Sequence, residues 1–386
     1  MTNAYDLAIA GGGIFGLSIA RAAAASGLSV ALIEAERLGA GASGGVLGAL
    51  MPHMPARWND KKAFQFAALK DLVAHVGALE AETGLATGYR RCGRVMPITS
   101  EDRLIHQKLR ADESLTRWDT SETGFSYKID TPQTHATWLT PDAAPFGVVY
   151  ETLSARVAPM AYLGAVSASL TQTHWQSVDI LTGERFESFD EATGEVRLSG
   201  GTALKAGKVV LANGHSVFGL IETLTGQEVG SGEKGQALLI EGTGLEAMPA
   251  VYCDGVYVVP HDDHTVAVGS TAIRDFDDVN PDPVKSEELL ERARGFCPAL
   301  AHRNVIRSWA GVRPRCHSRD PLIGLLPDHT RTYVATGGYK ISFGIAHLVA
   351  DALVSQLTGA EPENPLPETF QPEHHFGANA LASDRA

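Results

Sequence analysis

The distribution of apolar and polar residues changes character along the chain and divides it into regions with different expected structure. Residues 6–10 form a short apolar strand, an alanine-rich helical stretch follows, and Leu28–Ile33 is a second apolar run. Apolar residues then recur at helical spacing from Lys62 to Thr83. From Tyr89 to about Val149, short strand-like pieces alternate with turns among many charged residues. The first part of the chain therefore predicts a β-α-β unit, a long helix and a region of short strands.

The rest of the chain returns to regular elements. Helical spacing predicts three further helices, at Ala158–Leu170, Ser286–Gly295 and Ile345–Leu357. Short apolar runs bounded by turn residues predict strands at Val178–Leu181, Val196–Leu198, Lys208–Leu211, Gln236–Glu241, Val251–Val259, Thr265–Val268 and Thr332–Thr336. Trp309–Gly324 is expected to be a loop region rich in functional residue types. The proline- and glutamate-rich segment from residue 363 onwards is expected to be extended and poorly anchored.

The order of these elements predicts an α/β protein of two interleaved domains, because β-α units at both ends of the chain flank a strand-rich middle. We expect a Rossmann-like nucleotide-binding domain and an α+β substrate domain with a mixed or antiparallel sheet. The expected nucleotide-binding domain comprises residues 1–88, 150–225 and 309–362, the substrate domain 89–149 and 226–308, and the tail 363–386.

Composition and charge narrow the functional classes. Of the 386 residues, 44% are hydrophobic and 20% are charged, which is ordinary for a globular protein with a large core. A formal charge of −13 disfavours a surface that grips nucleic acid or anionic lipid without specificity. Asp6 interrupts the apolar amino terminus, and no uncharged apolar run reaches about 18 residues. We therefore expect a cytoplasmic protein with no membrane span.

The distribution of cysteine, histidine and arginine adds little to this picture. The four cysteines are scattered without zinc-type spacing, and most of the 14 histidines stand singly in polar segments. We therefore expect neither a disulfide framework nor a metal site. A basic patch at residues 90–94 is explained as well by a solvated strand edge as by a ligand.

A glycine-rich turn follows the first apolar strand and carries the clearest functional signal. Gly11, Gly13 and Gly16 occupy the G-x-G-x-x-G positions, where they allow a tight turn, close approach of a pyrophosphate and close packing of helix on strand. The following helix directs its free N–H groups at the phosphates. Glu34 ends the next strand at the spacing of a carboxylate that accepts from ribose hydroxyls. This predicts an ADP-binding half-site and disfavours NADP. A second glycine-rich turn spans residues 39–45.

Taken with later segments, these motifs resemble the D-amino-acid-oxidase-like family of FAD-dependent oxidoreductases, and most closely its glycine oxidase branch. The resemblance covers about residues 4–360. The segments that carry it are 11–16 with Glu34, 41–53, 209–216, 256–260 with 268–271, 308–314 with 320–324, and 335–344.

The resemblance implies that FAD is the cofactor, and we expect it to be held without a covalent bond. Sarcosine oxidases tether FAD through a cysteine in this region, but Arg313 takes that place here and Cys316 lies three residues later. The cofactor-binding residues implied are Gly11, Gly13, Ile14, Phe15, Gly16, Glu34, Ala35, Ala42, Ser43, Gly48, Ala49, Phe186, Ala212, Gly214, Gly338, Tyr339, Lys340, Ile341, Ser342, Phe343 and Gly344.

The resemblance also places catalytic candidates. Arg313 falls on the arginine that holds the substrate carboxylate, and its planar fork suits that task because it offers two charge-assisted hydrogen bonds. Tyr257 falls on the tyrosine that faces the substrate. His53 either lines the flavin or only packs. Lys340 either lies near the flavin N1 edge or the oxygen site, where it would stabilise the reduced flavin, or faces solvent on its loop. Gly338 departs from the branch, which commonly has histidine there.

The implied reaction is oxidation of a small amino acid or secondary amine such as glycine, sarcosine or a D-amino acid. Hydride passes to flavin N5, the imine is hydrolysed in water, and O2 or another acceptor reoxidises the flavin. The alternative is an oxidase acting on a modified tRNA wobble uridine of the carboxymethylaminomethyl type. Segments 51–52, 319–321 and 361–367 resemble the oxidase half of such tRNA-modifying enzymes, but the net negative charge disfavours tRNA. The oligomeric state is left open.

Overall fold

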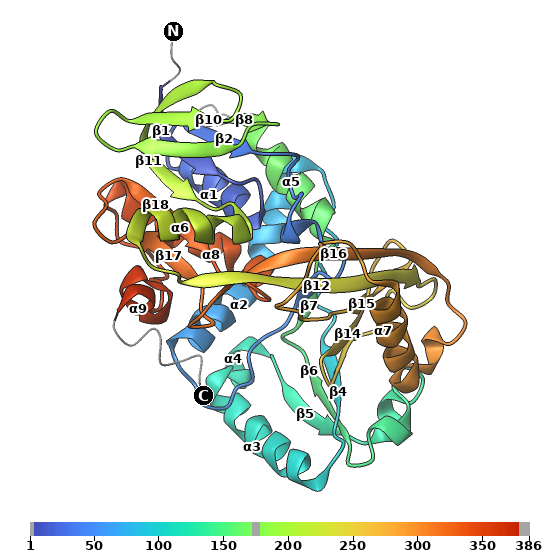
Figure 1. The fold of residues 1–386 in the computed structure, drawn as a ribbon. Coiled ribbons are helices and arrows are strands. Elements are labelled where there is room, and N and C mark those ends of the chain that lie inside the picture. The colour runs from blue at the N-terminus through green and yellow to red at the C-terminus, as the bar shows by residue number, and fades with distance from the viewer. Residues whose placement is uncertain (1–3, 172–177, 378–386) are drawn as a thin grey trace.

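The structure, a computed structural model, describes residues 4–171 and 178–377 and has two lobes (Figure 1). One lobe is a largely parallel sheet covered by helices, and the other is built on a large mixed sheet. The long strands β12 (Gly230–Glu241) and β16 (Val305–Cys316) pair along their length and run between the lobes. The predicted α/β class is confirmed.

The sheet of the first lobe has the order β17-β18-β11-β1-β2-β8, and a hairpin of β9 and β10 extends from β11. Its central strands are parallel, as the β-α-β pattern predicted, and only β17 joins the end of this path antiparallel. The strands are β1 (Ala4–Ala10), β2 (Val30–Glu34), β8 (Val178–Thr182), β9 (Phe186–Asp190), β10 (Glu195–Leu198), β11 (Ala203–Leu211), β17 (Leu322–Leu325) and β18 (Thr332–Thr336).

Strand β1 shows how this sheet divides its two faces. Leu7 and Ile9 pack into the core with the helix layer, whereas Ala8 and Ala10 pack into the cluster on the opposite face, because successive side chains of a strand point to opposite sides. The helix layer comprises α1 (Ile14–Ala25), α2 (Asp60–Thr83), α5 (Pro159–Thr171) and α8 (Ser342–Thr358). Helix α6 (Val217–Thr225) covers the other face. The predictions of α2, α5 and α8 are confirmed to within a few residues.

The sheet of the second lobe has the order β16-β12-β15-β14-β13-β4-β6-β5 and is antiparallel except between β13 and β4. Helix α7 (Pro283–Phe296) packs on one face. The remaining strands are β4 (Arg94–Pro97), β5 (Tyr127–Asp130), β6 (Val148–Glu151), β13 (Ala250–Cys253), β14 (Val256–Pro260) and β15 (Thr265–Gly269). A two-stranded pair, β3 (Ala49–Leu50) with β7 (Ala155–Arg156), stands apart from both sheets.

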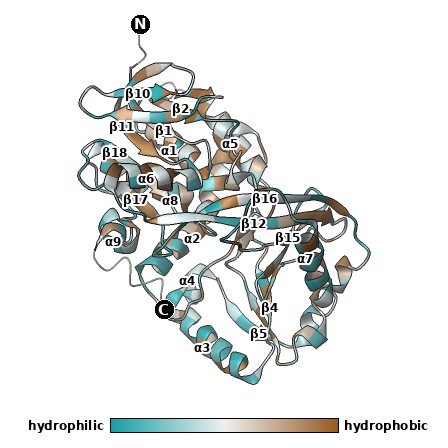
Figure 2. Cartoon of the chain, viewed as in Figure 1, coloured by the Kyte–Doolittle hydropathy of each residue, from teal (hydrophilic) through white to brown (hydrophobic). Residues whose placement is uncertain are grey.

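The structure differs from the sequence expectation in the second lobe. Helix α3 (Glu101–Arg117) lies where short strands and turns were expected, followed by the one-turn α4 (Thr120–Thr123). Figure 2 shows α3 as largely hydrophilic, and within it only Ser114 is fully buried. Charged and polar residues dominate this segment, so its few apolar positions were not recognised as one face of a helix. Serine is a favourable N-cap residue, and in the structure the side chain of Ser100 caps this helix by accepting a hydrogen bond from Arg103 N.

Two further expectations are corrected. Most of the region from Trp309 to Gly324 is strand rather than loop, because residues 305–316 form β16 and pair with β12. Residues 309–316 therefore belong to the second sheet and not, as expected, to the domain that contains the first sheet. The tail is anchored as far as residue 377, since Phe370 is 1% exposed and the short helix α9 (Pro372–Phe376) packs on β17. Residues 378–386 lie outside the described part.

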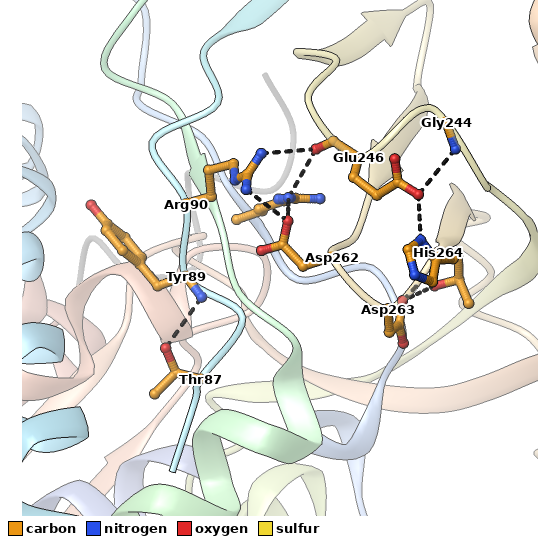
Figure 3. Close-up of polar contacts among 10 residues, drawn as sticks. Thr87, Tyr89, Arg90, Gly244, Glu246, Asp262, Asp263 and His264 are labelled. Carbon is orange, nitrogen blue, oxygen red and sulfur yellow. Dashed lines mark hydrogen bonds and ion pairs between the residues drawn. The ribbon is translucent and has the colours of Figure 1, made fainter. Parts of the chain in front are cut away.

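A polar cluster ties the segment after α2 to loops of the second sheet (Figure 3). Arg90 and the fully buried Arg156 both pair with Asp262, at 3.1 and 2.7 Å, and both donate to the carbonyl of Glu246. The Glu246 carboxylate also bonds His264. The 90–94 patch is thus no simple solvated edge: Arg94 is buried and pairs with the buried Glu151 at 3.0 Å.

Candidate active site

The predicted dinucleotide turn adopts the geometry that its glycines require. Gly11 has φ of 110°, a conformation that L side chains rarely adopt, and a Cβ there would lie 2.5 Å from the Ala212 carbonyl oxygen. A Cβ at Gly16 would overlap the carbonyl of Gly11, so helix α1 packs against β1 only with glycine there. The turn therefore brings the ends of β1 and β11 together.

The amino-terminal end of α1 fits an anionic phosphate. Its N-cap residue, Gly13, offers no side-chain acceptor, and the first turn contains no acidic residue. Ser43 Oγ accepts from Ile14 N at 3.0 Å, which brings the second glycine-rich turn against the first. The remaining N–H groups and the positive end of the helix dipole suit a pyrophosphate. The second turn forms a single 3-10 turn at Ala42–Gly44.

Glu34 lies at the end of β2, beside this turn. Its carboxylate accepts from Gly12 N at 2.7 Å and from Glu36 N at 2.9 Å, and Ala35 is the residue between. Each carboxylate oxygen has acceptor capacity beyond one such bond, as ribose hydroxyl donors require. The residues present therefore fit the adenosine half of a dinucleotide.

The glycine loop after β18 joins this site to the rest of the chain. Thr336 Oγ1 donates to the Gly214 carbonyl at 3.2 Å, so the loops after β11 and β18 meet. A Cβ at Gly338 would lie 2.7 Å from the ring of Phe15 and 2.6 Å from Ser342 Oγ. This explains why glycine replaces histidine: the ring of Phe15, in the first turn of α1, lies directly beside that position.

His53 belongs to the segment that leaves the second glycine turn. Gln65 of α2 holds the backbone of this segment in place. Its side chain accepts a hydrogen bond from His53 N at 2.7 Å and donates one to the Met51 carbonyl at 3.0 Å. Burial, followed by the charge of Lys61, lowers the pKa of His53 to about 4. His53 is therefore uncharged at neutral pH. Lys61 forms an ion pair with Asp320.

Gly48 and Ala49 lie in the same segment, and Ala49 enters β3. Phe186 is placed differently from the other predicted cofactor contacts. It starts β9, and its ring packs against the apolar cluster on the α6 face of the first sheet. The structure therefore brings together the residues of the loops after β1, β2, β11 and β18, and places Phe186 in the neighbouring hairpin.

Arg313 stands on β16 at the junction of the lobes. Its guanidinium donates to Ser270 Oγ at 3.2 Å and to the Thr271 carbonyl, and Nε is buried without a hydrogen-bond partner. Burial lowers the pKa of Arg313. Within the described ranges, no carboxylate lies within ion-pair distance of this guanidinium. A largely desolvated cation without an acidic partner is costly unless an anionic ligand binds it.

Tyr339 and Tyr257 flank this arginine. Cζ of Arg313 lies 5.3 Å from the centre of the Tyr339 ring, and the Tyr339 hydroxyl donates to Glu233. Tyr257 stands on β14 with its ring 4.6 Å from that of Tyr252, and burial is the main cause that raises its pKa. Since Tyr339 follows Gly338 directly, one short loop connects Arg313 to the first turn of α1.

Gly235 and Glu233 on β12, with Ser270 and Thr271 after β15, are site residues that sequence analysis did not single out. In the β12–β16 ladder Glu233 lies opposite Arg313, and a Cβ at Gly235 would overlap the guanidinium of Arg313. Segment 268–271 of the sequence analysis contains Ser270 and Thr271, but the contact of these two residues with Arg313 depends on strand register.

Other classes of site are not indicated by the described residues. No group of three or more histidine, cysteine, aspartate or glutamate side chains in residues 4–171 and 178–377 is arranged to hold a metal ion. Across the same ranges, every helix is too short or too polar to cross a membrane. All four cysteines are free thiols.

Comparison with known proteins gives a consistent result. The family model described as "FAD dependent oxidoreductase" (DAO) matches residues 6–353. Glycine oxidase of Bacillus licheniformis is 24% identical over 383 residues, covering 97% of this chain and 98% of that protein. The crystal structure of glycine oxidase from Geobacillus kaustophilus superposes with a TM-score of 0.86 at 20% identity, covering 97% of this chain and all of that one.

A third relative is a bifunctional protein. The bifunctional protein MnmC of Idiomarina loihiensis, named for tRNA 5-methylaminomethyl-2-thiouridine biosynthesis, is 26% identical over 364 residues. The match covers 92% of this chain but only 56% of MnmC.

Proposed function

The chain belongs to the DAO family of FAD-dependent oxidoreductases, and we propose that it oxidises a small amine that carries a carboxylate. It is an FAD-dependent amine or amino-acid oxidoreductase of the glycine oxidase type. Glycine, sarcosine and D-amino acids are examples of such amines. The observation that carries it is Arg313, because its guanidinium is desolvated, oriented and without an acidic partner among the described residues.

The proposed roles follow from what each side chain can do. Arg313 binds the substrate carboxylate with charge-assisted hydrogen bonds and so fixes the neighbouring carbon. FAD, when bound, supplies the acceptor for a hydride from that carbon. Tyr257 bounds the pocket, and Trp309, whose ring packs against Gly45 and Gly311, helps to exclude water. Orientation is the main requirement of such a reaction, so no acid-base pair is needed.

The remaining steps need little from the protein. The imine product would be hydrolysed in water to an oxo acid and ammonia or an amine, and O2 or another acceptor would reoxidise FAD. The neutral state of His53 suits a side chain that packs beside the cofactor rather than one that carries charge. The cofactor contacts proposed are those expected from the sequence, except Phe186, whose ring packs in the apolar cluster on the α6 face, and the exposed side chain of Lys340.

We propose that FAD is held without a covalent bond. Cys316 is fully buried in the apolar cluster on the α6 face, and its thiol packs against Gly337. Burial raises the pKa of this thiol far above its ordinary value, which disfavours the reactive thiolate. Release of all flavin from the acid-denatured protein supports this assignment, whereas flavin retained in the precipitate contradicts it.

The similarity to MnmC supports a second candidate, oxidation of a carboxymethylaminomethyl group on a tRNA wobble uridine. That substrate also joins an amine to a carboxylate, so Arg313 could serve it in the same way. The net charge of −13 opposes tRNA binding. Flavin reduction by such a tRNA, but not by free amino acids, would favour this candidate.

The proposal is tested by mixing the FAD-loaded protein anaerobically with glycine, sarcosine and D-alanine and following the visible flavin absorbance. Arg313→Met should lower kcat/KM by roughly 30-fold or more, because losing one partner of a desolvated charge pair costs about 2–5 kcal/mol. Arg313→Lys keeps the charge and should lose less. The matched control is Arg197→Met, since Arg197 is an exposed arginine on β10. Unchanged kcat/KM in Arg313→Met would remove Arg313 from this role.

A further inference from the structure

Two cationic side chains, those of Arg313 and Lys340, lie near the same aromatic ring, that of Tyr339, in the proposed substrate site. The centre of the Tyr339 ring lies 5.3 Å from Cζ of Arg313 and 5.1 Å from Nζ of Lys340. The two positive charges are therefore at most about 10 Å apart. Tyr339 has φ of 44°, a left-handed conformation that tyrosine rarely adopts, so its surroundings hold the loop in this shape.

Neither cation has its charge balanced by a close acid. In the described part of the chain, no carboxylate lies within ion-pair distance of Arg313 or Lys340. Glu233, on the neighbouring strand β12, is already engaged, since it accepts from the Tyr339 hydroxyl and lies 3.9 Å from the buried Arg315. The cluster of Arg313, Lys340, Arg315 and Glu233 therefore carries more positive than negative charge.

Lys340 can be reached by a ligand and is affected by Arg313. The residue is exposed, yet protein atoms around its ammonium lower its pKa by desolvation. The charge of Arg313 lowers that pKa further, against the opposing effect of Glu233. A ligand with a single carboxylate bound to Arg313 would offer no anionic group to Lys340. A second carboxylate would bind Lys340 and reduce the repulsion between the two cations.

Resting on the proposed function, we propose that the substrate is a secondary amine with two carboxylates, of the N-(carboxyalkyl) amino acid class. Arg313 binds the carboxylate next to the carbon that is oxidised, and Lys340 binds the distal carboxylate. Lys340 is then a specificity-determining residue, and monocarboxylates such as sarcosine are poorer ligands than their dicarboxylate counterparts.

The chemistry is balanced within the proposed reaction. The C–H bond beside the first carboxylate breaks, and FAD, when bound, would accept its hydride, while the nitrogen gives up its proton to water and a C=N bond forms. Water then adds to this bond and the C–N bond breaks. The half held by Arg313 leaves as a 2-oxo acid, and the half held by Lys340 leaves as a primary amine that keeps its carboxylate.

The test compares two non-oxidisable ligands of the FAD-loaded protein, thiodiglycolate with two carboxylates and (methylthio)acetate with one. Their dissociation constants are measured by calorimetry, so the readout does not depend on turnover. In the wild type, thiodiglycolate should bind at least tenfold more tightly. Lys340→Met should abolish most of this ratio and Lys340→Arg should keep it. Lys108→Met, at an exposed lysine of α3, is the matched control and should keep it too.

The outcomes separate this inference from the proposed function. A wild-type ratio near one, or a ratio that Lys340→Met leaves unchanged, would overturn the dicarboxylate assignment alone. Arg313→Met should weaken both ligands, and if it weakens neither, the proposed carboxylate anchor fails as well. A Lys340→Met variant that weakens both ligands equally and slows flavin reoxidation would instead assign Lys340 to the flavin, which contradicts the proposal.

Discussion

Gly235 lies directly under the guanidinium of Arg313, and this contact shows how one residue without a side chain can position another. The long side chain of Arg313 crosses from β16 over β12 to reach Ser270 and Thr271 beyond β15. A Cβ at position 235 would overlap the guanidinium, so the path exists only because glycine stands there. Gly235 is a positioning residue and does not itself touch the substrate.

Gly235→Ala should therefore displace Arg313 and raise KM for a carboxylate substrate at least tenfold, because the two charge-assisted hydrogen bonds can no longer form together. The measurement is steady-state kinetics at equal FAD occupancy, with kcat and KM reported separately. An increase in KM with kcat largely kept indicates lost binding, whereas a wild-type KM would show that Arg313 does not need this path.

Helices α2 and α3 mark the limit of pattern-based prediction at the scale of the element. Helix α2 was predicted to within two residues, since its buried side chains recur along one face that packs against α5 and α8. Helix α3 was missed because its few apolar residues, among them Ile105, Leu109 and Leu115, stand among many charged ones. A segment dominated by charged residues is easily taken for turns and strand edges, even when its few apolar positions share one helix face.

Helix α2 also contains a position, Gly77, at which a substitution should stabilise the protein. Gly77 is exposed in its interior, and a Cβ there would meet no atom within 4 Å. Gly77→Ala should raise the free energy of unfolding by about 0.5–1 kcal/mol, because alanine reduces the backbone entropy lost on folding. Urea unfolding measures this change. A decrease in stability would show that the helix is not continuous through this position. The same variant is a control for Gly235→Ala, since both add one methyl group.

The whole molecule holds several histidines uncharged, and this sets its response to acid. Burial is the first cause that lowers the pKa of His53 to about 4, of His75 to about 3 and of His375 to about 4. His75 lines a cavity of about 220 Å³ among the helices of the first lobe, with its ring 4.7 Å from that of the buried His347. Asp351, on the same cavity, has a raised pKa.

The sign of the pH dependence follows from these shifts. The unfolded chain protonates its histidines near pH 6.5, whereas the folded chain resists protonation until about pH 3–4. Stability is therefore complete above about pH 6.5 and is lost as the pH falls, by up to about 1.4 kcal/mol per pH unit for each such histidine. Asp351 opposes this trend only at the acidic end, because its carboxyl binds its proton more readily in the folded state.

Urea unfolding at about pH 7 and about pH 5 measures this effect, and the free energy of unfolding should be lower at about pH 5. His75→Gln should reduce the pH dependence, whereas His106→Gln, at an exposed histidine of α3, should leave it unchanged. Equal pH dependence in all three proteins would show that His75 is not the group responsible.

The sequence by itself determined the β-α-β start, the glycine turn, Glu34 and the identity of Arg313 as a candidate, because each rests on local spacing or on a recognisable motif. It also indicated the family and hence FAD. The tertiary structure decided what surrounds Arg313: Gly235 and Glu233 lie about 80 residues away along the chain and reach it through the register of β12 and β16. It also decided that Gly338 must make room for Phe15 and that β16 is a strand. These facts escape a linear pattern because strand register and close packing arise only when distant segments meet.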